Sequence, residues 1–407
     1  MSIAAWVFAA SFLACLYVYA GYPALLAVLA RVRRRPVMRS DYRPRITVII
    51  PAFNEQDSIA HKITSTLANG YPGSRLEVIV ASDGSTDRTN EIVRGFEPRV
   101  HLLALPRGGK VAALNAAVRD ATGDIVVFTD ADVILDDDAL LRLVSSFADP
   151  DVGGVTGRKA YLLEPAQSAI QRGDGLYSRF DEWQKQMESR IGSTIASHGA
   201  LHAIRRDLYV NVDDPTVADD MAISMQVVLQ GKRLVYEPDA VARVERPIDG
   251  RTEFARRVRI ANQVMRAMFG LKSVLWTSGF YSVQLISHKL LRYWVPVLLI
   301  MMLVSNTTLA IDSGVWRTLL VLQAAFYGAA VTALLFGERY RGPWLRVLTV
   351  PCYFCAVNAA ALVALLSLAR GRRSATWSPG AGFREGAGTG RSWTLAPRAA
   401  SRTPAAS

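Results

Sequence analysis

Long stretches without a charged residue lie at the two ends of the chain, whereas charged and apolar residues are mixed in the middle. One stretch runs from Ser2 to Ala30, and three more lie near the C-terminus, from Tyr293 to Ile311, from Thr318 to Gly337 and from Val347 to Ala369. Each is close to the roughly 20 apolar residues that an α-helix needs to cross a bilayer. The pattern predicts a membrane protein with a soluble middle part.

The charges that flank the first stretch predict its orientation. Arg31, Arg33, Arg34 and Arg35 follow it directly, and positive charge beside a span prefers the cytoplasm. A cleaved signal peptide carries its positive charges before the apolar run, which is the reverse of the order here. We therefore expect Met1 outside, the following domain in the cytoplasm, and a multi-pass protein of the inner (plasma) membrane.

The last stretch, Val347 to Ala369, leaves two interpretations open. If it spans the bilayer, the tail from Arg370 onward lies outside, although that tail holds seven arginines and one glutamate. Pro351 and Asn358 within the stretch are also compatible with a re-entrant or interfacial segment. The sequence alone does not decide between them.

The middle part alternates apolar β-rich runs with amphipathic helical segments. Four such runs predict buried strands. Helices are expected between them, from about Ser58 to Leu67 and from Val111 to Arg119. This alternation predicts a parallel, doubly wound sheet, whose ligands bind at the carboxyl ends of the strands. The four strands are Ile46–Ile50, Glu77–Ala81, Val100–Leu105 and Ile125–Phe128.

Candidate functional residues lie in the loops that follow these strands. Asp130 and Asp132 come directly after the last one, and paired carboxylates there suit a hard cation such as Mg²⁺ or Mn²⁺ on a diphosphate. A solvated acidic turn is the simpler alternative for that pair. Gly108 and Gly109, just before Lys110 at a helix start, form a plausible phosphate cradle or an ordinary loop.

Net charge and cysteines add little to this interpretation. The chain has 407 residues, 20% of them charged, and a formal net charge of +12. Half of that charge lies in the tail and much of the rest flanks the spans, so we expect contacts with membrane lipids and no nucleic acid. Cys15, Cys352 and Cys355 all lie inside apolar runs, where a packing role is expected.

Four sequence segments, taken together, resemble a known family. VIIPAFNE, VASDGSTDRT, RGGKVAALNAA and TDAD occur in this order and spacing. The combination resembles the inverting family 2 glycosyltransferases with the GT-A nucleotide-sugar fold. More closely, the chain resembles membrane-integrated bacterial members related to cellulose, hyaluronan and poly-N-acetylglucosamine synthases. The resemblance covers about Ile46 to Arg266 and implies an α/β fold with a mostly parallel central sheet, plus N-terminal and C-terminal transmembrane helices.

The resemblance also implies roles for individual residues. The donor would be a nucleotide sugar, with UDP as the family expectation, and the cofactor Mg²⁺ or Mn²⁺. Asp220 matches the general base, at the start of a helix that runs to about Gln230, and Asp219 stands where the family usually has glutamate. The remaining assignments are donor binding by Glu55, Asp83, Lys110 and Asp130, metal binding by Asp132 and Asp130, and an acceptor region around Gly199 and His202.

One departure from the family concerns the acceptor. Synthases that stay on a growing chain commonly carry Gln-x-x-Arg-Trp on an interfacial helix, and here Arg256 to Ile260 keeps only the arginine, Arg259. Arg259 could still pair with the diphosphate, on a basic amphipathic helix expected from Glu253 to Phe269. Because an indole platform is missing and the candidate spans are few, we expect transfer to a lipid-linked or polysaccharide acceptor, or polymer synthesis with a homo-oligomer or an export partner.

Two alternatives to this predicted function remain open. One is single-sugar transfer to polyprenyl phosphate or a glycolipid, and the other is a catalytically silent membrane scaffold. We expect the domain organisation to be an N-terminal helix with its basic flank (1–35), a cytosolic GT-A domain (43–245), interfacial helices (246–292), a C-terminal membrane region (293–370) and a basic disordered tail (371–407).

Overall fold

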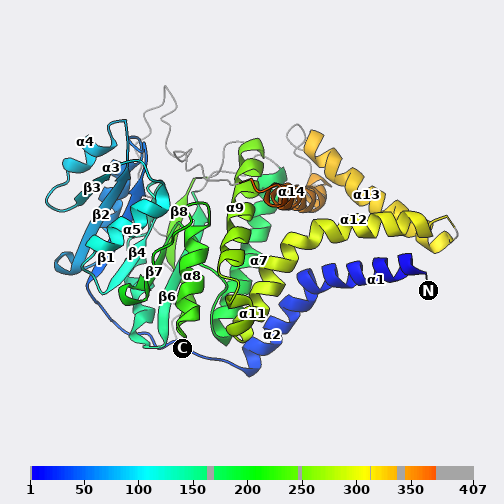
Figure 1. Cartoon of the computed structure of the whole chain (residues 1–407), viewed down its shortest axis with the longest axis horizontal. Coiled ribbons are helices and arrows are strands. Elements are labelled where there is room, and N and C mark those ends of the chain that lie inside the picture. Colours follow the sequence, from blue (N-terminus) through cyan, green and yellow to red (C-terminus); the bar gives the residue numbers. More distant parts are fainter. Residues whose placement is uncertain (1, 163–168, 246–249, 312, 337–343, 373–407) are drawn as a thin grey trace, which may run out of the picture.

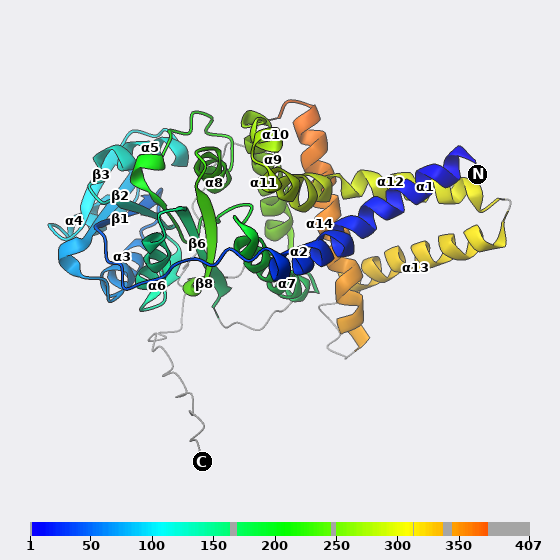
Figure 2. The same ribbon diagram turned by 90° about the horizontal axis from the view of Figure 1, so that it is seen from below.

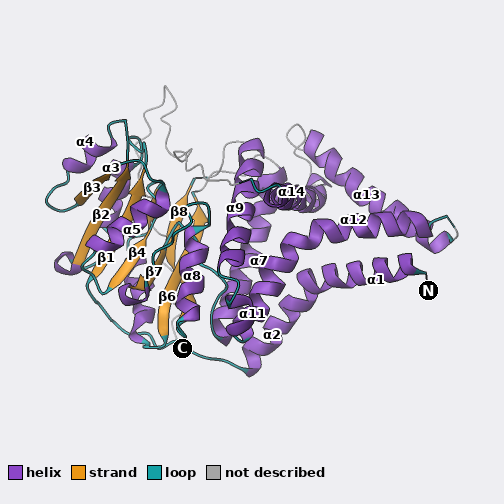
Figure 3. Ribbon diagram, in the orientation of Figure 1, coloured by secondary structure: helices purple, strands orange, loops and turns teal. Residues whose placement is uncertain are grey.

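The computed structural model describes residues 2–162, 169–245, 250–311, 313–336 and 344–372. An α/β domain lies at one end of the molecule, and apolar helices extend from it along the long axis (Figure 1). Helices surround the sheet on both faces, as the colouring by secondary structure shows (Figure 3). Most of the predicted disordered tail, from Arg373 on, lies outside the described residues.

The sheet has eight strands in the order β3-β2-β1-β4-β7-β6-β8-β5. The four predicted strands form its parallel half, since β1 pairs in parallel with β2 and β4, and β2 with β3. The other half is mixed: β7 runs antiparallel to β4 and β6, β6 is parallel to β8, and β5 is antiparallel to β8. The strands are β1 Ile46–Ala52, β2 Leu76–Asp83, β3 His101–Leu105, β4 Ile125–Phe128, β5 Val133–Leu135, β6 Val152–Tyr161, β7 His202–Arg205 and β8 Arg233–Val244.

Both faces of the sheet are buried, which explains the uninterrupted apolar runs in its strands. Alternate residues of β1 enter two cores: Val48 and Ile50 pack under one helical layer, and Ile49 under the other. The first layer consists of α3 (Ile59–Leu67), α4 (Thr89–Arg94) and α6 (Ala139–Ser145). The second contains α5 (Lys110–Asp120) and α8 (Asp219–Leu229), with α9 (Gly250–Gly270), α10 (Val274–Thr277) and α11 (Phe280–Gln284) beyond them.

Within the described residues, four helical segments are long and apolar enough to cross a membrane. They are 3–32, 280–309, 314–336 and 347–369. The first combines α1 (Ile3–Leu16) and α2 (Tyr22–Val32), and the others contain α12 (Leu291–Leu309), α13 (Gly314–Phe336) and α14 (Trp344–Ala369). The second begins at Phe280, earlier than the predicted Tyr293. Its polar early residues are covered by protein: His288 Nδ1 lies 2.7 Å from Oε1 of Glu188 on α7 (Ala169–Ile191).

The four segments do not share one direction. In Figure 1, α1, α12 and α13 run along the long axis while α14 is seen nearly end-on. In the view from below, α14 lies across the other three (Figure 2). It is a continuous helix of 26 residues despite Pro351 within it, so of the interpretations that the sequence left open, a span and an interfacial helix remain.

Candidate active site

Lys110, the first residue of α5, brings together two carboxylates from distant parts of the chain. Its Nζ lies 2.9 Å from Oδ1 of Asp130, just after β4, and 3.2 Å from Oδ2 of Asp219, at the start of α8. Burial alone would lower the pKa of Lys110, but the charges of Asp130 and Asp219 outweigh it and raise that pKa. Three residues predicted separately therefore form one charged cluster at the carboxyl edge of the sheet.

Asp83, the last residue of β2, is buried and holds the neighbouring glycine loop. Its carboxylate accepts hydrogen bonds from the backbone N–H of Gly108 at 2.6 Å and of Gly109 at 2.9 Å, and it pairs with Arg107. The Arg107 guanidinium lies 3.4 Å from the ring centroid of Phe53. Both amides of this glycine pair therefore donate to Asp83 in this structure, and the phosphate cradle stays a prediction beside the ordinary loop.

Glu55 occupies the matching place after β1. It is buried, its Oε2 accepts a hydrogen bond from Ser58 Oγ at 2.6 Å, and its backbone N–H donates to Thr89 Oγ1 at 2.8 Å. Since Ala52 of β1 pairs with Ser82 of β2, the two acidic loops leave the sheet side by side. The structure thus places Glu55 and Asp83 at one edge, as expected.

Asp130 and Asp132 form the acidic turn that leads into β5. Burial and the charge of Asp130 raise the pKa of Asp132, so the pair holds negative charge that a cation would offset. Within the described residues no group of three or more His, Cys, Asp and Glu could hold a metal ion. Two carboxylates fit a hard cation that takes its other ligands from diphosphate oxygens and water.

Asp220 lies at the start of α8, next to Asp219. Its Oδ1 accepts a hydrogen bond from the backbone N–H of Met221 at 2.7 Å. Burial, followed by the charge of Asp219, raises the pKa of Asp220 to about 6. A carboxylate with a pKa close to neutral pH is suited to accept a proton from a substrate hydroxyl.

Gly199 and His202 lie against this cluster in different ways. A Cβ on Gly199 would come within 2.8 Å of Oδ2 of Asp130, so only glycine leaves that carboxylate its place. His202 is buried, stacks on Phe128 with ring centroids 4.9 Å apart, and has its Nδ1 3.2 Å from the carbonyl oxygen of His198. Burial lowers its pKa to about 4, which leaves a neutral imidazole packed beneath the site.

Arg259 on α9 faces the same cluster. Burial and the neighbouring Arg256 lower its pKa, while the charges of Asp130 and Asp219 act in the opposite direction. The guanidinium is therefore within electrostatic reach of both carboxylates. A role of Arg259 in binding the diphosphate stays a prediction.

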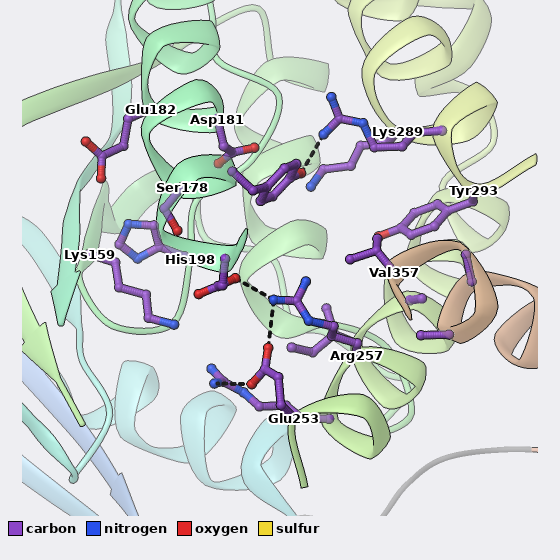
Figure 4. Close-up of a pocket in the computed structure, with 18 of the residues that line it drawn as sticks. Lys159, Ser178, Asp181, Glu182, His198, Glu253, Arg257, Lys289, Tyr293 and Val357 are labelled. Atoms are coloured by element: carbon purple, nitrogen blue, oxygen red, sulfur yellow. Dashed lines mark hydrogen bonds and ion pairs between the residues drawn. The ribbon is translucent and has the colours of Figure 1, made fainter. Parts of the chain in front are cut away.

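A cavity of about 280 Å³ lies between the catalytic domain and the membrane helices, and Lys159 and Arg256 in its lining interact electrostatically with Asp132. Figure 4 shows Arg257 between two carboxylates there: it pairs with Asp174 and lies 2.7 Å from Oε1 of Glu253. Apolar residues of α14 close the side that faces the membrane helices, among them Val357 and Ala361. The charged lining residues are Lys159, Asp174, Asp181, Glu182, Lys185, Glu253, Arg256, Arg257, Lys289 and Arg292.

Two lysines near the site were not predicted. Lys62 is buried on α3, donates a 2.7 Å hydrogen bond to Thr129 Oγ1, and has a pKa lowered to about 7 by burial. A signal for it was available, since it shares the buried helix face with Ile59 and Ile63. Lys159, whose pKa burial lowers to about 8, lies on β6, a strand that the sequence patterns did not indicate.

The fold and this site define a membrane-attached glycosyltransferase of the GT-A type. Residues 47–209 match the family model described as glycosyl transferase family 2. This match covers residues 47–209, and the relatives and the solved structure below support the same assignment, a glycosyltransferase with a family 2 domain.

Relatives with known names agree. Poly-beta-1,6-N-acetyl-D-glucosamine synthase of Staphylococcus aureus (strain MSSA476) is 28% identical over 222 residues, which is 52% of either chain. A probable glycosyltransferase of Bacillus subtilis (strain 168), YdaM, is 27% identical over 229 residues, or 54% of either chain. The chain therefore matches about half the length of these curated relatives.

A solved structure covers more of the chain. It is the mannosyltransferase PcManGT of Pyrobaculum calidifontis, determined in complex with GDP-Man and Mn²⁺. The TM-score is 0.66 at 27% identity, and the match covers 88% of this chain and 99% of that one. The likeness includes the GT-A fold and extends well beyond the catalytic domain.

Proposed function

We propose that this protein transfers a sugar, with inversion, from a nucleotide sugar to a lipid-linked or polysaccharide acceptor at the membrane. The observation that carries the proposal is the cluster of Lys110, Asp130 and Asp219 at the sheet edge, together with the cavity beside the membrane helices, whose Lys159 and Arg256 interact electrostatically with Asp132. A donor at the sheet edge and an acceptor in the cavity would meet at this cluster. The catalytic domain would be cytosolic.

On the donor side, Glu55 and Asp83 hold the nucleoside end, and Asp130 and Asp132 hold the diphosphate through Mg²⁺ or Mn²⁺. The cation supplies positive charge against the leaving diphosphate when it is bound. The neighbour's GDP-Man and Mn²⁺ support this arrangement by analogy. Lys110 and Arg259 add fixed positive charge from this chain on the same side.

On the acceptor side, Asp220 takes the proton of the attacking hydroxyl. The acceptor oxygen bonds to the anomeric carbon, the bond from that carbon to the diphosphate breaks, and the diphosphate leaves with the electron pair. Because attack and departure occur on opposite faces, the anomeric configuration inverts. A pKa of about 6 keeps Asp220 ionised at neutral pH and ready for this step.

The proposal is tested by nucleotide release from a panel of UDP- and GDP-sugars, using membranes that contain this protein. Release from one donor should be lost with EDTA and restored by Mg²⁺ or Mn²⁺. It should fall by at least about 10²-fold in Asp220→Asn, since a lost general base typically costs 10²- to 10⁴-fold. Asp207→Asn is the matched control, because Asp207 also lies at a helix start but is exposed.

Product analysis separates the remaining functions. One or a few sugars on a lipid would support the lipid-linked acceptor, including a polyprenyl phosphate. Long chains made by the purified protein alone would contradict the transfer of only one or a few sugars to each acceptor. Nucleotide binding without turnover on any donor, even with membrane extract as acceptor, would favour a silent scaffold.

A further inference from the structure

The helix α14 runs crosswise to the other candidate spans. Figure 2 shows its two ends at a similar position along the long axis, next to the catalytic domain, while the N-terminus and the turn between α12 and α13 lie far from that domain. A helix of 26 residues is roughly 39 Å long, enough to span a bilayer. If α1, α12 and α13 cross the membrane, however, a helix that runs crosswise to them lies parallel to the membrane plane. The direction of α14 is that of such a helix.

One side of α14 is fixed to helices of the catalytic part. Ala364 packs against Ala261 and Met265 of α9. The ring of Tyr353 lies 5.0 Å from the guanidinium carbon of Arg257, and a Cβ on Gly173 of α7 would come within 2.4 Å of Tyr353. These contacts hold α14 across the face where α7 and α9 meet the membrane helices.

The opposite side of the second half of α14 is apolar and exposed, since Val363 and Leu366 are 42% and 45% exposed. At the start of the helix, Val347 and Val350 are 67% and 56% exposed. A helix that is apolar all round belongs in a nonpolar environment on every side. Protein covers one side here, and lipid tails suit the other.

The charges beside α14 give an independent argument. Arg339, Arg341 and Arg346 precede or begin it, and Arg370, Arg372 and Arg373 follow it. The connection between α12 and α13 carries only Asp312, with Arg317 just beyond it. Clusters of positive charge beside apolar segments stay on one side of a membrane, so both ends of α14 should share that side.

We propose that α14 does not cross the membrane but lies in its plane, just beneath the headgroups on the side of the catalytic domain. The chain then has three spans, formed by 3–32, 280–309 and 314–336, and the tail from Arg370 lies on the same side as the catalytic domain. The two interpretations that the sequence left open are thereby decided in favour of an interfacial helix. This inference does not depend on the proposed reaction.

Cysteine labelling tests the side of the tail. In a background of Cys15→Ala, Cys352→Ala and Cys355→Ala, a single cysteine replaces Ser374 in the tail. Ser74→Cys, exposed on the catalytic domain, marks one side, and Ser313→Cys, in the turn before α13, marks the other. A membrane-impermeant maleimide is applied to intact cells and to sealed vesicles of opposite orientation.

Ser374→Cys should label together with Ser74→Cys in one preparation, and Ser313→Cys in the other. Labelling of Ser374→Cys together with Ser313→Cys would overturn the proposal. A second experiment measures how deep α14 lies in the bilayer. A fluorophore is attached to Val347→Cys or to Ala359→Cys, and its quenching is compared for lipids that carry a nitroxide at two different depths. The two positions should be quenched alike, whereas a spanning α14 would separate them by about 18 Å in depth.

Discussion

The sheet edge that we propose binds the donor and the cavity that we propose binds the acceptor are built in different ways. At the donor edge, Glu55, Asp83 and Asp130 each lie at or within three residues of the carboxyl end of a strand, so the sheet aligns them. The cavity takes its walls from β6, α7, α9, α12 and α14, which are spread over about half the chain. The first arrangement is local in sequence and the second depends on how helices pack.

This difference has a consequence for mutations. A change at the donor edge removes a group from a rigid frame, so its effect should fall on catalysis. A change in the cavity alters a charge among several that partly compensate one another, so its effect should be smaller and concern the acceptor.

The largest effect is expected for Asp132→Ala. Losing a carboxylate that holds the cation on the diphosphate removes several kcal/mol of charge stabilisation, so kcat/KM should fall about 10³-fold. Asp137→Ala, exposed in the loop after β5, is the control and should stay near wild type. The measurement is nucleotide release over a Mn²⁺ titration. Wild-type kcat/KM in Asp132→Ala at low Mn²⁺ would remove this residue from the metal site.

A smaller loss is expected for Gly199→Ala. The added methyl group would lie 2.8 Å from Oδ2 of Asp130 and must displace that carboxylate. A shift of about 1 Å in a catalytic group can cost about 10²-fold, so kcat/KM should fall between about 10- and 100-fold. Gly192→Ala is the matched control, because its Cβ meets nothing within 4 Å. Equal activity of the two variants, with both folded by thermal unfolding, would contradict the close fit.

Removing one cavity charge should act on the acceptor alone. In Lys159→Gln, a half-buried cation that lines the cavity becomes neutral, and we expect the acceptor KM to rise about tenfold, which is about 1.4 kcal/mol. The donor KM should remain unchanged. Lys272→Gln, on an exposed lysine, controls for net charge. A change in donor KM of the same size would show that the cavity and the donor edge are not separate sites.

The same contrast explains what the sequence could and could not predict. The runs Ile46–Ile50 and Ile125–Phe128 are apolar because both faces of the parallel half are buried, and this pattern is visible without a structure. Strands β5 to β8 were not predicted from the sequence, because their pairing is mixed and β5 has only three residues. That Asp83 binds the loop at Gly108 could not be foreseen either, since nothing local links the two.

Among the membrane helices, length and apolarity identified the segments but not their direction. Val347 to Ala369 has the composition of a span, and only its packing against Ala261, Met265 and Arg257 shows that it lies crosswise. Composition reports what environment a helix prefers. Its orientation depends on contacts with partners far away in the chain.

The pH dependence of the reaction should show one acid limb. With the pKa of Asp220 raised to about 6, the carboxylate is deprotonated above that pH and protonated below it. A base must be deprotonated to accept the hydroxyl proton, so kcat/KM should fall about tenfold per pH unit well below pH 6. The profile is measured at saturating Mn²⁺. A flat profile down to pH 5 would exclude Asp220 as the base.

The smallest effect is expected for His202→Asn, and it decides which group causes that limb. An unperturbed histidine has a pKa of about 6.5, close enough to be confused with Asp220. Burial lowers the pKa of His202 to about 4, so its imidazole stays neutral throughout the measured range. Asparagine can still donate toward the carbonyl of His198, and only the stacking on Phe128, worth about 1 kcal/mol, is lost. The acid limb should therefore stay near pH 6 in His202→Asn, with a slightly lower melting temperature. Loss of the limb in this variant would transfer the proton-accepting role from the carboxylate on α8 to the imidazole on β7.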